Sequence, residues 1–165
     1  MRRCIEHRSF IPVAEVPAAM PEGISVKYCV HWPGTAREIT PDSVQKIMMK
    51  LRKGEWTDLF LSDDEDLEEC YINLEGDGTL YSLGYVRHEG LAGEEGAWWS
   101  TYDPEYLGSD EETDIGCSDG QSIIFRETTT ADKEAVMTAI EYFIRTGELW
   151  NGIPWMKNWD EWVEE

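Results

Sequence analysis

The strongest constraint on the fold is one amphipathic pattern near the end of the chain. Val136, Ile140, Phe143 and Ile144 recur at helical spacing and form one apolar stripe. A helix with a single apolar stripe needs an apolar surface to cover. The pattern therefore predicts a helix that packs on a sheet.

The ends of this helix also carry sequence signals. Thr129 or Thr130 is a suitable N-cap, and Asp132 follows Thr129 by three residues, as in a capping box. Gly147 follows the last apolar residue, where a left-handed C-cap is common. The apolar run at residues 123–125 predicts a short strand that leads into the helix.

A second helix is predicted over residues 41–53. Thr40, Pro41 and Asp42 are an N-cap, a first-turn proline and a first-turn acid. Gly54 follows the last turn. The residues expected to be buried are Val44, Ile47, Met48 and Leu51.

The remaining pattern is that of short strands and turns. Residues 70–74 and 79–86 flank a turn at 75–78 and predict a hairpin. Asp119-Gly120 predicts a second hairpin between residues 113–118 and 121–126, and further strands are expected at 24–32 and 97–102. The fold class is therefore α+β, with an antiparallel sheet of about five to six strands and two main helices packed on one face.

The length of 165 residues predicts a single domain over residues 1–165. Residues 1–23 mix Arg, Pro and Ala and are expected to form an irregular N-terminal arm. Residues 156–165 are expected to form an acidic tail that contains tryptophan. Trp155, just before this tail, is expected to be buried.

The charge is distributed unevenly. The formal net charge is −20, and residues 55–119 hold 20 Asp and Glu against one basic residue, Arg87. Binding to nucleic acid depends on Lys and Arg that neutralise phosphates, so this composition argues against a nucleic-acid partner. It favours a basic protein surface, whose approach the acidic field accelerates.

Patterns typical of catalytic and metal sites are absent from the sequence. There is no P-loop, GxGxxG, GxSxG or HExxH motif, and the four cysteines are widely spaced. We therefore expect no enzymatic activity, no catalytic residues, no cofactor and no metal site. No apolar run suggests a signal peptide or membrane span, so a cytoplasmic protein without a membrane partner, monomeric or weakly dimeric alone, is expected.

Partner binding is predicted on two acidic loops and nearby aromatic residues. Charge alone does not hold a partner tightly, and aromatic side chains are enriched at binding hot spots. Because Trp98 and Trp99 are adjacent on one strand, one of them is expected to be in the core. The candidate residues are Asp63, Asp64, Glu65, Asp66, Glu68, Glu69, Trp98, Trp99, Tyr102, Asp110, Glu111, Glu112 and Asp114.

The C-terminal block also resembles a known family. Its pattern consists of Ala135, Ala139, Glu141, Phe143, Thr146, Gly147, Ile153 and Trp155. This pattern is similar to the end of immunity protein family one of bacterial polymorphic toxin systems, and the similarity covers roughly residues 41–155. The resemblance implies an α+β inhibitor that binds a cognate toxin domain, often a nucleic-acid deaminase, and blocks its active site. The alternative is an acidic adaptor or scaffold domain that binds a protein other than a toxin.

Overall fold

The computed structural model describes residues 1–31, 34–63, 70–87, 97–116 and 123–164. In this part of the chain, eight strands form one antiparallel sheet in the order β1-β8-β7-β6-β5-β4-β2-β3. The strands are β1 (Arg2–Ile11), β2 (Tyr28–Val30), β3 (Arg37–Glu38), β4 (Asp58–Ser62), β5 (Cys70–Gly76), β6 (Tyr81–Arg87), β7 (Ala97–Thr101) and β8 (Trp155–Glu164). The helices are α1 (Pro41–Arg52) and α2 (Lys133–Thr146), with short 3-10 turns η1 (Pro104–Tyr106) and η2 (Arg126–Thr128).

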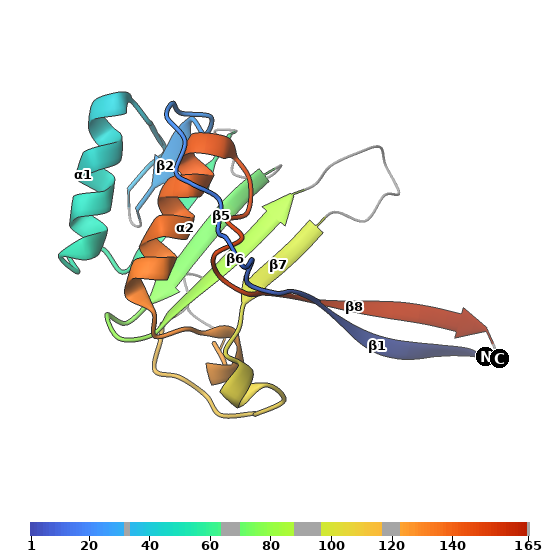
Figure 1. Cartoon of the computed structure of the whole chain (residues 1–165). Coiled ribbons are helices and arrows are strands. Elements are labelled where there is room, and N and C mark those ends of the chain that lie inside the picture. The colour runs from blue at the N-terminus through green and yellow to red at the C-terminus, as the bar shows by residue number, and fades with distance from the viewer. Residues whose placement is uncertain (32–33, 64–69, 88–96, 117–122, 165) are drawn as a thin grey trace.

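Both α-helices cover the same face of the sheet, as Figure 1 shows. The side chains of α2 that form the predicted apolar stripe are fully buried against alternate residues of β4, β5 and β6. The rings of Tyr85 and Phe143 meet edge to face, with their centroids 5.9 Å apart. The α+β class is therefore confirmed, whereas the predicted number of strands was too low.

The two helices begin and end almost as the sequence indicates. Thr40 caps α1 in a capping box: its Oγ1 accepts from the Ser43 N–H, and its own N–H donates to Ser43 Oγ. At the end of α2, Gly147 is left-handed (φ 73°), and its N–H donates to the Phe143 carbonyl at 2.7 Å. The predicted N-cap of α2 was wrong: Asp132 fills it, because Thr130 instead pairs with Tyr81 through two backbone hydrogen bonds.

The predicted hairpin is confirmed, with its turn shifted along the chain. Gly76 still belongs to β5, and the turn follows at residues 77–80. Asp77 Oδ1 accepts from the N–H groups of Thr79 and Leu80, each at 2.8 Å. Gly78 supplies the positive φ (91°) that this turn requires.

The predicted strand at residues 123–125 was wrong. Ile123 and Phe125 are exposed, and Phe125 makes only an isolated bridge to Glu112. The chain passes directly into η2 instead of entering the sheet. The turn of the second predicted hairpin, at Asp119 and Gly120, lies outside the described residues.

The termini differ most from the expectation. Residues 2–11 are not irregular, because they form β1 and pair along their whole length with β8, which occupies the predicted tail. This two-stranded ribbon extends away from the body, with both termini at its tip (Figure 1). Within the predicted N-terminal arm, residues 12–23 lack a helix or strand. Backbone contacts hold them to the segment after α2, including the bond from Ala14 N–H to the Asn151 carbonyl at 2.8 Å.

Trp155 is predicted to be the most sensitive tryptophan for stability. It is fully buried, as the sequence predicted, and its Nε1–H donates to the Trp150 carbonyl at 2.9 Å. Trp155→Ala is expected to lower the free energy of unfolding by about 3–5 kcal/mol, because it leaves a cavity in the core. Denaturation with urea measures this change.

Trp162→Ala is the matched control, because Trp162 lies on the same strand and is 65% exposed. It is expected to change the free energy of unfolding by less than about 0.5 kcal/mol. Equal destabilisation by the two substitutions would contradict the core role of Trp155.

Candidate functional site

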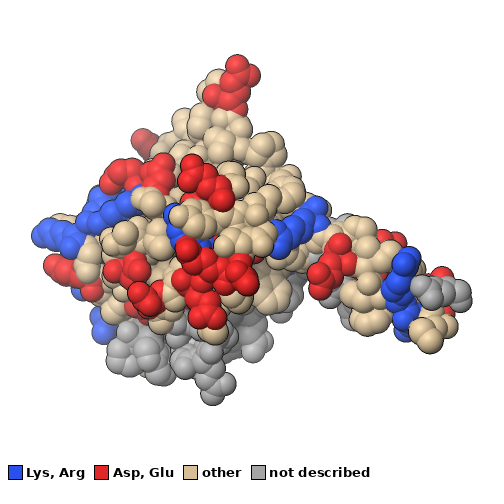
Figure 2. Space-filling model, turned by 90° about the horizontal axis from the view of Figure 1, so that it is seen from below, with Lys and Arg blue, Asp and Glu red and all other residues tan. Residues whose placement is uncertain are grey.

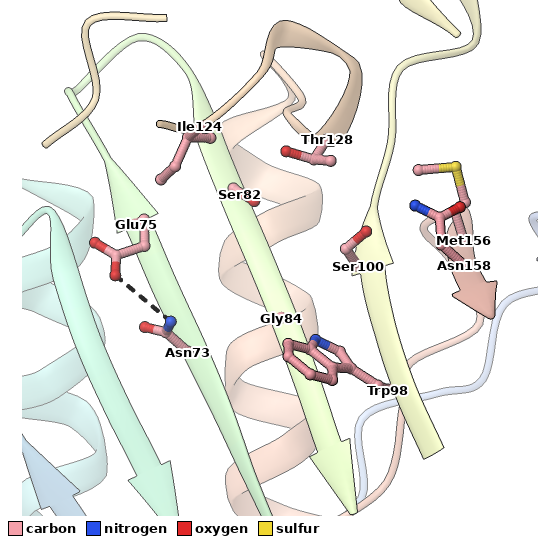
Figure 3. A pocket seen from close by; sticks show the side chains of 10 residues that line it. All are labelled: Asn73, Glu75, Ser82, Gly84, Trp98, Ser100, Ile124, Thr128, Met156 and Asn158. Carbon is pink, nitrogen blue, oxygen red and sulfur yellow. Dashed lines mark hydrogen bonds between the residues drawn. The ribbon is translucent and has the colours of Figure 1, made fainter. Parts of the chain in front are cut away.

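The face of the sheet opposite the helices is the candidate site. In Figure 3 this face points toward the viewer and α2 lies behind the strands. Alternation places Asn73 and Glu75 of β5, Ser82 and Gly84 of β6, and Ser100 of β7 on this face. Small side chains at these central positions leave the surface hollow.

A cavity of about 450 Å³ lies on this face. Asn73, Gly84, Ser100 and Met156 occupy one row across four neighbouring strands. A Cβ added to Gly84 would meet no atom within 4 Å, so the space above this glycine is open. The full lining is Asn73, Glu75, Ser82, Gly84, Trp98, Ser100, Ile124, Thr128, Met156 and Asn158 (Figure 3).

The polar groups of the cavity come mainly from β5. Residue Glu75 is only 4% exposed, and its carboxylate Oε1 accepts a long hydrogen bond of 3.5 Å from Asn73 Nδ2. Asn73 Oδ1 is buried and accepts no hydrogen bond from the residues that the structure describes. A buried acceptor without a hydrogen-bond donor is energetically costly, so a donor group of a bound partner would stabilise it.

One end of the cavity is closed by the segment that precedes α2. Ile124 and Thr128 line that end, and the Thr128 carbonyl accepts from the buried Thr101 hydroxyl at 2.9 Å. Glu127 forms an ion pair with Arg8 of β1 and accepts from the Gly108 N–H at 2.9 Å. These contacts fix the rim of the cavity to β1 and β7.

The predicted aromatic residues divide between the two faces of β7. Trp98 lines the cavity and is 67% exposed, whereas Trp99 packs against the core. As expected, the two indoles lie on opposite faces, but Trp99 is only partly buried and packs against the core rather than within it. Tyr102 lies just beyond β7, where its ring contacts that of Phe10 with centroids 5.3 Å apart.

The second predicted acidic loop borders the site. Asp110, Glu111, Glu112 and Asp114 are all exposed. Their segment runs against residues 124–126, with the Glu111 carbonyl accepting from Arg126 N–H at 2.8 Å. Because Ile124 is part of the cavity wall, this loop flanks the closed end.

The first acidic loop leaves the opposite end of the strands. Asp63 is exposed and directly follows β4, whose last residue, Ser62, is in one row with Tyr71, Val86 and Trp98. The structure therefore places Asp63 and residues 110–114 at opposite ends of the open face. Asp64, Glu65, Asp66, Glu68 and Glu69 lie outside the described residues.

The polar residues of β5 and β6 were not among the site residues predicted from the sequence. Glu75 was assigned to a turn, and Asn73 and Ser82 were treated only as strand positions. The alternation of Asn73 and Glu75 with buried Ile72 and Leu74 was a usable signal. Among the described residues, no group of three or more His, Cys, Asp or Glu side chains could hold a metal ion, and no helix is long and apolar enough to cross a membrane.

The glycines of the central hairpin provide a test of the cavity floor. Gly84→Ala is expected to keep or raise the free energy of unfolding by up to about 1 kcal/mol, because its Cβ enters open space and glycine weakens a strand. Urea denaturation measures the change.

Gly76→Ala is the control within the same hairpin. A Cβ at Gly76 would lie 2.8 Å from Tyr81 Cδ1 and 3.0 Å from the Thr57 carbonyl oxygen, so the substitution is expected to destabilise the fold. If Gly84→Ala destabilises the protein as much as Gly76→Ala, the floor of the cavity is not open as described.

Comparisons with known proteins add no relative from which a role could be transferred. No family model, no curated protein and no solved structure matches this chain. The resemblance to the immunity family therefore rests on the sequence pattern around α2.

Proposed function

We propose that this protein is an inhibitory binding protein of the immunity type, which holds a basic partner protein against the open face of its sheet. The observation that carries the proposal is a hollow sheet face that contains a buried carboxylate and an exposed indole, with Asp63 at one end and the acidic residues 110–114 at the other. The resemblance of residues 135–155 to an immunity family supports it. The expected partner is a toxin domain that acts on nucleic acid.

The cavity suits a basic side chain of the partner. An incoming Lys or Arg would find the Glu75 carboxylate and Asn73 Oδ1 as acceptors at the base of the cavity. The Trp98 indole at the rim offers a ring face for a cation–π contact. A desolvated contact of this kind supplies the affinity that exposed ion pairs do not.

The acidic segments would act mainly on the rate of encounter. Residues 55–119 hold 20 acids and one basic residue, so their field attracts a basic surface over a distance. A toxin that modifies nucleic acid must present basic side chains to phosphates. An acidic face placed over that surface would exclude the nucleic-acid substrate.

Trp98 is predicted to be the binding hot spot. The experiment is capture of the product of the neighbouring gene, followed by measurement of Kd with surface plasmon resonance. Trp98→Ala is expected to weaken binding by at least about 2 kcal/mol, or roughly thirtyfold in Kd, because it removes the aromatic rim of the cavity.

Trp162→Ala is again the control, because Trp162 matches Trp98 in exposure (65% against 67%) and lies on the ribbon. It should bind with nearly the wild-type Kd. If Trp98→Ala binds with the wild-type Kd, the open face is not part of the interface. Failure to capture any basic neighbouring product would contradict the inhibitor function itself.

The acidic segment at residues 110–114 is predicted to set the association rate. Replacing Asp110, Glu111, Glu112 and Asp114 with Asn or Gln should slow association and flatten its dependence on salt, with little change in melting temperature. Stopped-flow kinetics at rising salt measures both quantities. An association rate equal to that of the wild type at every salt concentration would show that this segment does not attract the partner.

A further inference from the structure

A second cavity, of about 430 Å³, lies at the other side of the molecule between α1 and the β2–β3 edge of the sheet. Its lining includes Arg37 of β3, Lys46 and Lys50 of α1, and the aromatic pair His31 and Trp56. Lys and Arg side chains gather at the left edge in Figure 2, which is the side on which α1 lies in Figure 1. A basic cavity is unexpected in a chain whose net charge is −20.

The spacing on α1 places two cations side by side. Lys46 and Lys50 are four residues apart, so they are neighbours on one helix face and repel each other. Arg37 adds a third positive charge, and Glu38 is the single carboxylate of the lining. Within the part of the chain that the structure describes, none of these three cations forms an ion pair.

The end of α1 builds the aromatic wall. Gly54 takes a left-handed conformation (φ 75°), and the turn returns the chain so that Trp56 N–H donates to the Lys50 carbonyl at 3.3 Å. Lys50 Nζ then lies 4.6 Å from the Trp56 ring centroid. The wall is therefore fixed to the same helix turn that carries one of the cations.

His31 completes this wall from β2's side. Its ring stacks on Trp56 with centroids 4.4 Å apart and planes 9° from parallel. Asp58 orients the imidazole, with 3.3 Å between His31 Nε2 and Asp58 Oδ1. Two rigid rings and three cations thus surround one concave space whose size is typical of small-molecule sites.

We propose that this cavity binds a small polyanion, a metabolite with at least two phosphate or carboxylate groups, held by Arg37, Lys46 and Lys50. Binding would offset the repulsion among the three cations, which have no ion-pair partner among the described residues. A nucleic acid fits poorly, because its extended phosphate chain would be repelled by a protein whose net charge is −20. A small ligand confined to the cavity avoids that repulsion.

The test uses inorganic pyrophosphate and citrate as probes, each titrated into the whole protein. At least one probe is expected to raise the melting temperature with a saturating dependence on its concentration, beyond the effect of sodium chloride at equal ionic strength. Isothermal titration calorimetry then gives Kd. A response to pyrophosphate alone identifies a phosphorylated ligand, and a response to citrate alone identifies a polycarboxylate.

The variants are Lys46→Gln and Lys50→Gln, because glutamine keeps the helix and removes the charge. Each is expected to raise the Kd of the responding probe by about tenfold or more, through loss of a charge-assisted contact. Lys53→Gln is the control, because Lys53 ends the same helix and is not part of the cavity lining. Absence of a saturating response to both probes, or equal Kd values for the lining variants and the control, would overturn the proposal.

Discussion

The structure depends on the burial of one apolar layer between the helices and a single face of the sheet. Trp155, Phe143 and Ile140 in this layer are fully buried. Both α-helices pack on the same face, so neither of these two helices covers the opposite face (Figure 1). One-sided packing therefore creates both the stability of the domain and the open face on which partner binding is proposed.

Strands β5 and β6 contribute side chains to both faces of the sheet. Buried residues of β5 and β6 alternate with Asn73, Glu75, Ser82 and Gly84, so each strand contributes to the core and to the cavity at once. The period of two in a strand makes this coupling unavoidable. A one-residue slip of the hairpin would exchange the two sets of side chains.

Acidic and basic residues are also separated in space. Acidic residues flank the open face at Asp63 and at residues 110–114, whereas Lys46, Lys50 and Arg37 line the cavity beside α1. The two regions therefore favour ligands of opposite charge. A basic protein at the open face and a small polyanion beside α1 could be bound by one domain without competing for the same surface.

Local patterns in the sequence determined the two helices, the central hairpin, the α+β class and the burial of Trp155. The capping residues of α1, Gly147 and the apolar stripes act within a few residues, so their effect does not depend on distant contacts. The adjacency of Trp98 and Trp99 within one strand likewise predicted that their side chains lie on opposite faces of the sheet.

Only the tertiary structure determined how the two termini fold, which residue caps α2 and which residues line the two cavities. The β1–β8 pairing joins residues from opposite ends of the chain, and β1 has no fully buried residue that would impose an alternating apolar pattern on its sequence. Asp132 caps α2 because the sheet engages Thr130 through Tyr81. Asn73, Gly84 and Ser100 meet in one row through three consecutive strands, whereas Met156 joins that row only through the β7–β8 pairing, which links strands distant in sequence.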